Sequence, residues 1–408
     1  MNPSEVLRIV DAIHRDKRIA KEIVFVGIEA AIATAARRQY GDEADVKIHV
    51  DRETGEITGI CNNEPIATDE LAERIGAQNA KQVMIQKIRE AERDAIFNEN
   101  YSQINQLVSG SIDKIEGSNV IVSLPGVVAI LSRYERIPGE SFRIGDRIRA
   151  VVTDVVKNGN RVNVMLSRIR PSFVQKLFEQ EIPEIQDAII EIKGVSREPG
   201  YRTKIAVYSS DQRVDCVGAC IGIRGSRIKS VTDELNNERI DVVPWSTDLQ
   251  LFIQDALKPA EVEEVILCSM LGRAIVLVKQ DNRSLAIGRK GQNVRLASRL
   301  VGWDIEIMTR EDLEELLEKA VEGYMLIDGV TSDMADRLVG EGFLSFDDLS
   351  IIEPDDLVQI GEITMDQAVA IIQQAEENAQ KEEDFKSQPR SDYEENESQE
   401  NYNTEKNE

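Results

Sequence analysis

Two stretches of this chain follow one pattern: Ile221-Gly222-Ile223-Arg224-Gly225-Ser226-Arg227-Ile228 and Ile287-Gly288-Arg289-Lys290-Gly291-Gln292-Asn293-Val294. Each reads Ile-Gly-x-x-Gly-x-x-(Ile/Val), leads into a helical pattern, and is followed by an alternating strand that begins at Ile240 or Ile305. The glycines of the two copies are 66 residues apart and the strands are 65 apart. A repeat of this length indicates two copies of one domain rather than a solenoid.

The chemistry of Gly-x-x-Gly favours contact with nucleic acid. Glycine allows a tight turn that comes close to a ligand, and the N–H groups at the start of the next helix attract anions. A turn of this kind in KH domains clamps about four nucleotides of single-stranded backbone. A purely structural turn is the less favoured alternative. Neither copy has the spacing of a P-loop or of a dinucleotide fold. The predicted RNA-binding residues are Gly222, Ile223, Arg224, Gly225, Arg227, Gly288, Arg289, Lys290, Gly291, Gln292, Asn293 and Arg295.

The distribution of charge agrees with this prediction, although the whole chain is acidic. The 408 residues carry a formal net charge of -25, but residues 311–408 hold 29 acidic and 6 basic side chains, which leaves residues 1–310 nearly neutral. The segments around the two loops are basic, with a net charge of +4 over residues 197–230 and +5 over residues 271–310. Local basic patches of this kind are typical of phosphate binding.

Several classes of function are disfavoured by composition. The chain has two histidines and four cysteines, too few for His-based catalysis or a disulfide framework. Cys216 and Cys220 lack two further ligands nearby and are read as packing residues rather than zinc ligands. The sequence shows neither a signal peptide nor an apolar run of about 20 residues. We therefore expect a cytoplasmic protein with reduced cysteines that holds no cofactor or metal.

The residues before the repeat predict two further domains. Residues 1–100 read as an α+β domain, with helices over about 21–40 and 79–98 and strands at Val46–Val50 and from Ile57. Residues 101–170 contain five short strands, over 108–115, 120–124, 127–131, 147–156 and 161–166, which favour a small barrel of the OB type. Tyr134 and Phe142 are the aromatics between these strands, and both a base-stacking role and a spacer role for the barrel stay open.

The acidic end divides into two parts. Residues 321–375 show apolar periodicity broken by turns, which resembles a helix-hairpin-helix domain. Its carboxylates oppose binding to DNA, so a protein-binding or autoinhibitory role is favoured. Residues 376–408 are rich in Glu, Asn, Ser, Gln and Lys and are expected to form a disordered acidic tail.

The two loops, with their flanks Val217–Arg227 and Ala286–Ser298, resemble the paired KH loops of the bacterial NusA family. The segments 80–93 and 181–185 are similar to that family's linker helix and to its entry into the first KH domain. The resemblance covers about residues 1–310. It implies a multidomain α+β fold with an N-terminal α+β domain, an OB-fold β-barrel, two tandem type II KH domains and an acidic helical C-terminal domain.

The resemblance also implies a function. Members bind RNA polymerase core through the N-terminal domain, here residues 1–100, and contact nascent single-stranded RNA through the barrel and the KH domains, here 171–258 and 259–320. They promote pausing and hairpin-dependent termination, join antitermination assemblies with other factors, and catalyse no reaction. We expect a monomer. The alternative hypothesis is a general single-stranded RNA chaperone or ribosome-associated protein.

Overall fold

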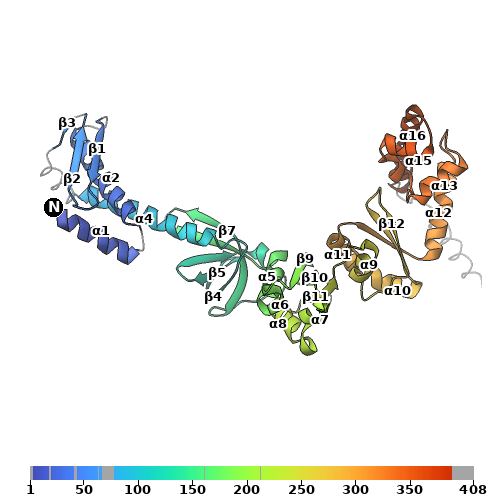
Figure 1. The fold of residues 1–408 in the computed structure, drawn as a ribbon, viewed down its shortest axis with the longest axis horizontal. Coiled ribbons are helices and arrows are strands. Elements are labelled where there is room, and N and C mark those ends of the chain that lie inside the picture. Colours follow the sequence, from blue (N-terminus) through green and yellow to red (C-terminus); the bar gives the residue numbers. More distant parts are fainter. Residues whose placement is uncertain are drawn as a thin grey trace, which may run out of the picture. The chain divides into compact units, whose positions relative to one another are not determined.

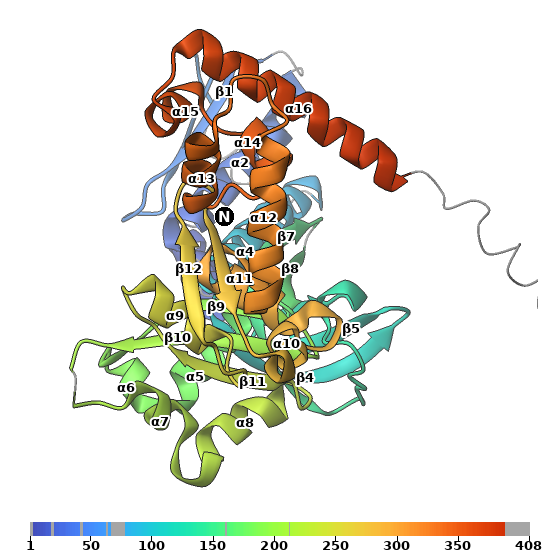
Figure 2. The same ribbon diagram turned by 90° about the vertical axis from the view of Figure 1, so that its right-hand side faces the viewer.

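The computed structural model describes residues 3–17, 20–40, 44–62, 64–66, 78–159, 161–211 and 213–387. The chain forms two compact units. Figures 1 and 2 show its helices and strands, coloured along the sequence from the N-terminus to the C-terminus. The first unit contains residues 1–189, 199–202 and 218–240, and the second contains 190–198, 203–217 and the residues from 241 onward.

The first unit begins with the predicted α+β domain. Its elements are α1 (Pro3–Lys17), α2 (Lys21–Tyr40), β1 (Val46–Val50), β2 (Ile57–Cys61), β3 (Glu64–Pro65) and α4 (Gln78–Tyr101). β1 and β2 pair antiparallel from Val46↔Cys61 to Val50↔Ile57, and β3, which the sequence reading did not include, extends the sheet beside β2. Apolar side chains that recur at helical spacing in α1 and α2 form one core with the inward strand residues. The predicted helices and strands of this domain are confirmed.

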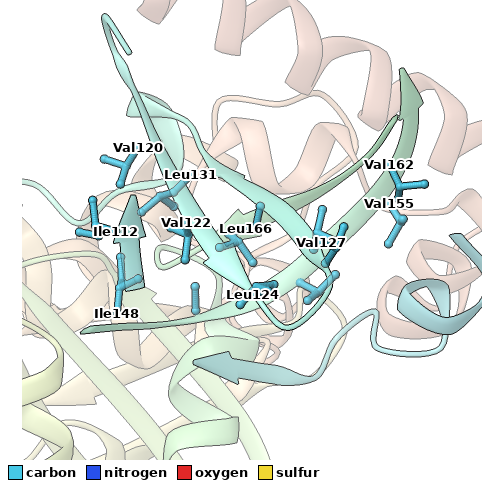
Figure 3. Close-up of a cluster of buried hydrophobic side chains, with 14 residues drawn as sticks. Ile112, Val120, Val122, Leu124, Val127, Leu131, Ile148, Val155, Val162 and Leu166 are labelled. Carbon is cyan, nitrogen blue, oxygen red and sulfur yellow. The ribbon is translucent and has the colours of Figure 1, made fainter. Parts of the chain in front are cut away.

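A closed five-stranded barrel follows. Its strands are β4 (Leu107–Glu116), β5 (Asn119–Leu124), β6 (Val127–Leu131), β7 (Arg147–Asn158) and β8 (Arg161–Ser167), in the order β4-β5-β6-β8-β7. Every predicted strand is present within two residues of its expected bounds. Alternate residues point inward and fill the barrel with aliphatic side chains, among them Ile112, Val122 and Leu166 (Figure 3). The architecture agrees with the predicted OB fold.

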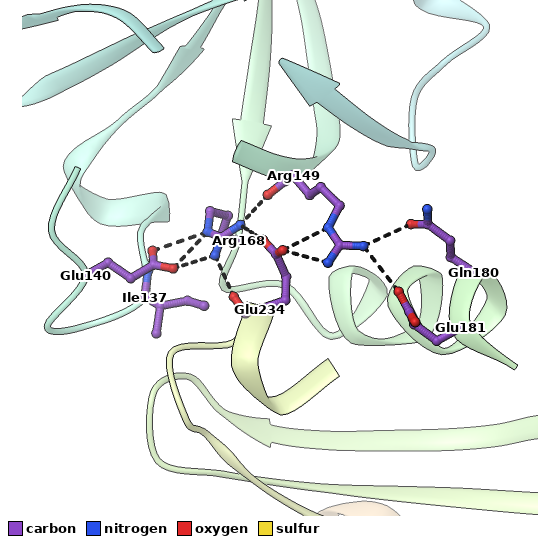
Figure 4. A network of polar contacts seen from close by, with 7 residues as sticks. All are labelled: Ile137, Glu140, Arg149, Arg168, Gln180, Glu181 and Glu234. Atoms are coloured by element: carbon purple, nitrogen blue, oxygen red, sulfur yellow. Dashed lines mark hydrogen bonds and ion pairs between the residues drawn. The ribbon is translucent and has the colours of Figure 1, made fainter. Parts of the chain in front are cut away.

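A buried arginine joins the barrel to helical segments of the same unit. Arg168 follows β8, is almost fully buried, and donates to the carboxylates of Glu140 and Glu234, at 2.5 and 2.8 Å (Figure 4). Arg149 on β7 donates to the second oxygen of Glu234 at 2.8 Å. Burial lowers the pKa of Arg168, but the two carboxylates outweigh that effect and the net pKa is raised. The guanidinium therefore stays charged, and its paired hydrogen bonds hold the barrel against the helix that carries Glu234.

The repeat in the sequence appears as a repeat of elements in the order helix-strand-strand-helix-helix-strand. The first copy consists of α5 (Pro171–Glu181), the short α6 (Pro183–Gln186), β9 (Ile190–Glu198), β10 (Arg202–Ser209), α7 (Cys216–Ile221), α8 (Ser226–Glu234) and β11 (Arg239–Pro244). The second copy consists of α9 (Leu249–Ala256), β12 (Glu264–Cys268), β13 (Arg273–Leu277), α10 (Gln280–Ile287), α11 (Gln292–Val301) and β14 (Asp304–Met308). Their sheets have the orders β11-β10-β9 and β12-β13-β14.

Helix α9 belongs to the second copy, although the boundary between the copies was expected at residues 258/259. Its side chains Phe252, Ile253 and Ala256 lie in the same core as Val276, and the Gln250 amide donates to the Val265 carbonyl at 2.8 Å. The second domain therefore begins near residue 249, because the sheet β12-β13-β14 needs α9 to cover one face.

The acidic domain is helical, as predicted. It contains α12 (Arg310–Tyr324), α13 (Ser332–Gly340), α14 (Phe346–Ser350), α15 (Pro354–Gly361) and α16 (Met365–Ser387) around a core of aliphatic residues, Tyr324 and Phe343. Helix α16 continues to Ser387, so residues 376–387 are helical rather than disordered. The rest of the expected tail, 388–408, lies outside the described residues.

Candidate nucleic-acid interface

The first loop, residues 222–225, connects α7 to α8 and belongs to the first unit. Its backbone has positive φ at Gly222 (73°), Arg224 (54°) and Gly225 (75°). A Cβ at Gly222 would lie 2.8 Å from Cγ of Arg227, so the close approach of that side chain requires glycine. The Ile223 side chain is 86% exposed, and Arg224 is also exposed. The loop thus presents one apolar and one cationic side chain to solvent.

Arg227 supports this loop from inside. Its guanidinium donates to the Ala219 carbonyl at 2.7 Å, at the end of α7, and to the Glu184 carboxylate at 2.8 Å. The pKa of Glu184 is lowered, first by a hydrogen bond from its own backbone N–H and further by Arg227. Arg227, predicted to bind RNA, is engaged within the protein in this structure.

The second loop, residues 288–291, repeats this geometry in the second unit. It connects α10 to α11, with φ of 75° at Gly288, 55° at Lys290 and 70° at Gly291. Arg289 and Lys290 are both exposed, and neither makes an ion pair with another described residue. Because this loop holds two cations, it presents more positive charge than the first.

Asn293 takes the place of Arg227 in the second copy. It is fully buried, and its amide donates to the carbonyls of Leu257 and Ala286, each at 3.0 Å. A Cβ at Gly288 would lie 2.7 Å from the Asn293 Cβ. The Asn293 side chain is therefore turned inward and holds the loop against the chain before it, while its contact with RNA stays a prediction.

Gln292 and Arg295 lie on the first turns of α11 and also have partners in the protein. Gln292 donates to the Glu198 carboxylate at 2.7 Å, and Arg295 donates to it through Nε at 2.7 Å. Sequence reasoning missed Glu184 and Glu198, the two carboxylates that hold loop residues. They lie 43 to 97 residues from their partners in the chain, and no local pattern links them.

The arrangement fits phosphate better than it fits metal or covalent chemistry. Exposed Arg224, Arg289 and Lys290 lie just before the first N–H groups of α8 and α11, which carry partial positive charge. Among the described residues, no group of three or more His, Cys, Asp and Glu could hold a metal ion. Burial raises the pKa of the Cys216 thiol, so that it stays protonated at neutral pH.

Comparison with known proteins agrees with this geometry. Residues 168–245 match the NusA-like first KH domain, residues 249–315 the NusA-like second KH domain, and residues 5–71 the NusA N-terminal domain. A transcription termination/antitermination protein NusA of Rickettsia conorii is 40% identical over 75% of this chain and 68% of its own length. The protein of the same description from Rickettsia prowazekii is 37% identical over 90% of this chain and 80% of its own length.

The chain belongs to the NusA family. Family membership makes it a transcription termination/antitermination factor with RNA-binding KH domains, and not an enzyme. The multidomain fold expected from the resemblance is confirmed. The NusA-like second KH domain begins at residue 249, which agrees with the placement of α9 in that domain.

The barrel aromatics differ in what they present. Tyr134, which follows β6, is 87% exposed. Phe142 is partly buried against the barrel core, with the Arg136 guanidinium 5.6 Å from its ring centroid. Phe142 therefore packs against the barrel core, and Tyr134 is the one of the two whose ring is largely exposed to solvent. The helices among the described residues include none that is long and apolar enough to cross a membrane.

We expect Gly288→Ala to destabilise the second unit by about 2–4 kcal/mol. The alanine would have to keep a φ of 75°, which residues with a side chain rarely adopt, and its Cβ would overlap with Asn293. Gly291→Ala is the matched control: its φ is also positive, but its added Cβ would meet nothing within 4 Å, so about 1 kcal/mol is expected. Guanidinium unfolding followed by tryptophan fluorescence measures both, because Trp245 and Trp303 pack against this unit's core. Equal losses for the two variants would contradict the argument.

Proposed function

We propose that this protein binds RNA polymerase core and nascent single-stranded RNA, promotes pausing and hairpin-dependent termination, and takes part in antitermination with other factors. The RNA-binding part of this proposal is supported by the pair of Gly-x-x-Gly turns, which present one exposed cation in the first loop and two in the second, each beside the N-terminus of a helix. Phosphates of an extended strand fit such turns, and the bases remain free to be read.

The RNA contacts proposed at the first loop are Gly222, Ile223, Arg224 and Gly225, and those at the second are Gly288, Arg289, Lys290 and Gly291. Glycine at the ends of each loop allows close backbone approach, and the cations between them contact phosphate. Arg227 acts from within the first loop and holds its shape. Binding is expected to weaken steeply with salt, because each neutralised phosphate releases counterions.

The polymerase contact is proposed for the N-terminal domain. Its match to the NusA N-terminal domain supports this assignment, as do apolar side chains that it leaves exposed, with Ile23, Val26 and Ile60 each exposing more than two fifths of their surface. Exposed aliphatic side chains on one small domain are suited to a protein partner. We further propose that the factor works as a monomer in the cytoplasm.

Deleting residues 1–66 tests the polymerase contact. This deletion keeps α4, which packs on the barrel through Ile96 and Phe97, so the barrel is expected to stay folded. We expect the shortened protein to lose capture by polymerase core and to lose its effect on pausing in a purified transcription assay, while keeping its affinity for free RNA. Retained capture would refute the assignment. Intact RNA affinity in the full chain with no effect on pausing would favour the RNA-chaperone alternative.

A further inference from the structure

Glu198 occupies two of the donors that the sequence assigns to RNA. It is the last residue of β9, and its carboxylate accepts from the Gln292 amide at 2.7 Å. Its other oxygen accepts from Arg295, at 2.7 Å from Nε and 2.6 Å from a terminal guanidinium nitrogen. All three residues belong to the second unit, and Gln292 directly follows Gly291 of the loop.

The contact between Glu198 and Arg295 is open to solvent. The Arg295 side chain is 44% exposed and that of Glu198 is 19% exposed. Ion pairs that are this exposed contribute little to stability, because water screens the two charges. A phosphate that arrives at the start of α11 meets a guanidinium that it can reach, and it offers the same bidentate geometry as a carboxylate.

Glu198 is charged at neutral pH. Burial raises the pKa of its carboxyl group, but the hydrogen bonds from Gln292 and Arg295 outweigh that effect and leave the pKa below its ordinary value. Its negative charge therefore lies beside the loop whenever RNA approaches. The charge repels phosphate and satisfies Arg295 at the same time.

We propose that Glu198 is an internal competitor of RNA phosphate at the second loop. In the free protein it holds Gln292 and Arg295, and a phosphate that binds at the start of α11 must displace it from Arg295. Arg289 and Lys290, which make no ion pair with another described residue, bind phosphate without such an exchange. Glu198 thereby lowers the affinity of the loop and favours release of RNA. This inference rests on the proposed function, because it requires RNA at the second loop.

Replacing Glu198 with glutamine tests the proposal in the full chain with a single-stranded oligoribonucleotide. We expect Glu198→Gln to bind about three- to tenfold tighter at low salt, since Arg295 is freed and one repulsive charge is lost. The slope of log affinity against log salt should steepen by about 0.7, the value for one further phosphate contact on a single strand. Glu315→Gln, which removes the exposed partner of Lys319 on α12, is the matched control and should leave affinity unchanged.

A double-mutant cycle separates competition from a change of net charge. The loss of RNA affinity caused by Arg295→Gln should be at least threefold larger in the Glu198→Gln background than in the wild type. In the wild type the Glu198 carboxylate already pairs with Arg295, whereas in Glu198→Gln the guanidinium is available to phosphate. Equal costs in the two backgrounds, or weaker binding by Glu198→Gln, would overturn the proposal. If the double variant Arg289→Asp/Lys290→Asp binds RNA with wild-type affinity, the second loop is not an RNA site and the proposed function fails. If that variant loses binding while Glu198→Gln is unchanged, the competitor role alone fails.

Discussion

Replacing Arg289 and Lys290 with aspartate is expected to lower affinity for single-stranded RNA about 100-fold at low salt. Two exposed cations at the turn become two anions, so two phosphate contacts are lost and repulsion replaces them. Lys290 has φ of 55°, a conformation that aspartate tolerates better than most residues, and Arg289 is exposed. The fold should therefore survive, which circular dichroism and filter binding on the same samples would show.

Two further double variants are compared with this one. Ile223→Asp/Arg224→Asp makes the same kind of change at the first loop and should weaken binding less, because one cation is lost there instead of two. Arg310→Asp/Lys319→Asp adds the same negative charge on α12 of the second unit and should have a much smaller effect. Wild-type affinity in both loop variants would show that the turns do not clamp RNA.

Asp348→Ala is expected to lower the free energy of unfolding of the acidic helical domain by about 3 kcal/mol. Asp348 is 4% exposed and forms a bidentate pair with Arg273 of β13, at 2.5 and 3.0 Å. The same carboxylate accepts from the Leu344 N–H at 3.0 Å. Removing it leaves a guanidinium and an N–H without their partner in a largely buried place, and this cost exceeds the net value of the pair.

Hydrogen exchange of residues 313–387 measures this loss, since opening of the helical domain exposes its amides. Asp347→Ala is the matched control: the neighbouring carboxylate is exposed, and its removal should change stability by less than about 0.5 kcal/mol. Equal protection in both variants would show that the ion pair does not fasten the domain.

The contact of Asp348 with Arg273 bears on the acidic domain's role. Leu344 and Leu313 share a small core with Cys268 and Leu277 of the second KH sheet, and Gly342, with φ of 95°, packs directly on the Cys268 side chain. The helical domain is thus fixed to the KH sheet by apolar contact as well as by charge. An autoinhibitory movement of the helical domain onto the RNA loops would have to break these contacts.

Local patterns in the sequence predicted most of the fold. The alternation of apolar residues located each barrel strand within two residues, because the side-chain period of a half-buried strand is directly visible in the sequence. The glycines of the two loops identified the KH turns, because Gly222 and Gly288 adopt a backbone and a close contact that only glycine allows. The same glycine pattern correctly predicted exposed loops for the three cations that lie between the glycines, Arg224, Arg289 and Lys290.

The tertiary structure decided which loop residues are free to meet a ligand. Asn293 points inward, and Arg227, Gln292 and Arg295 are held by Glu184 or Glu198, whose places in the chain give no hint of the contact. It also assigned α9 to the second KH domain and fixed the helical domain through Asp348. These features depend on which distant segments meet when the chain folds. Periodicity and loop composition report on neighbours along the chain, whereas an ion pair between residues 198 and 295 exists only after two domains pack together.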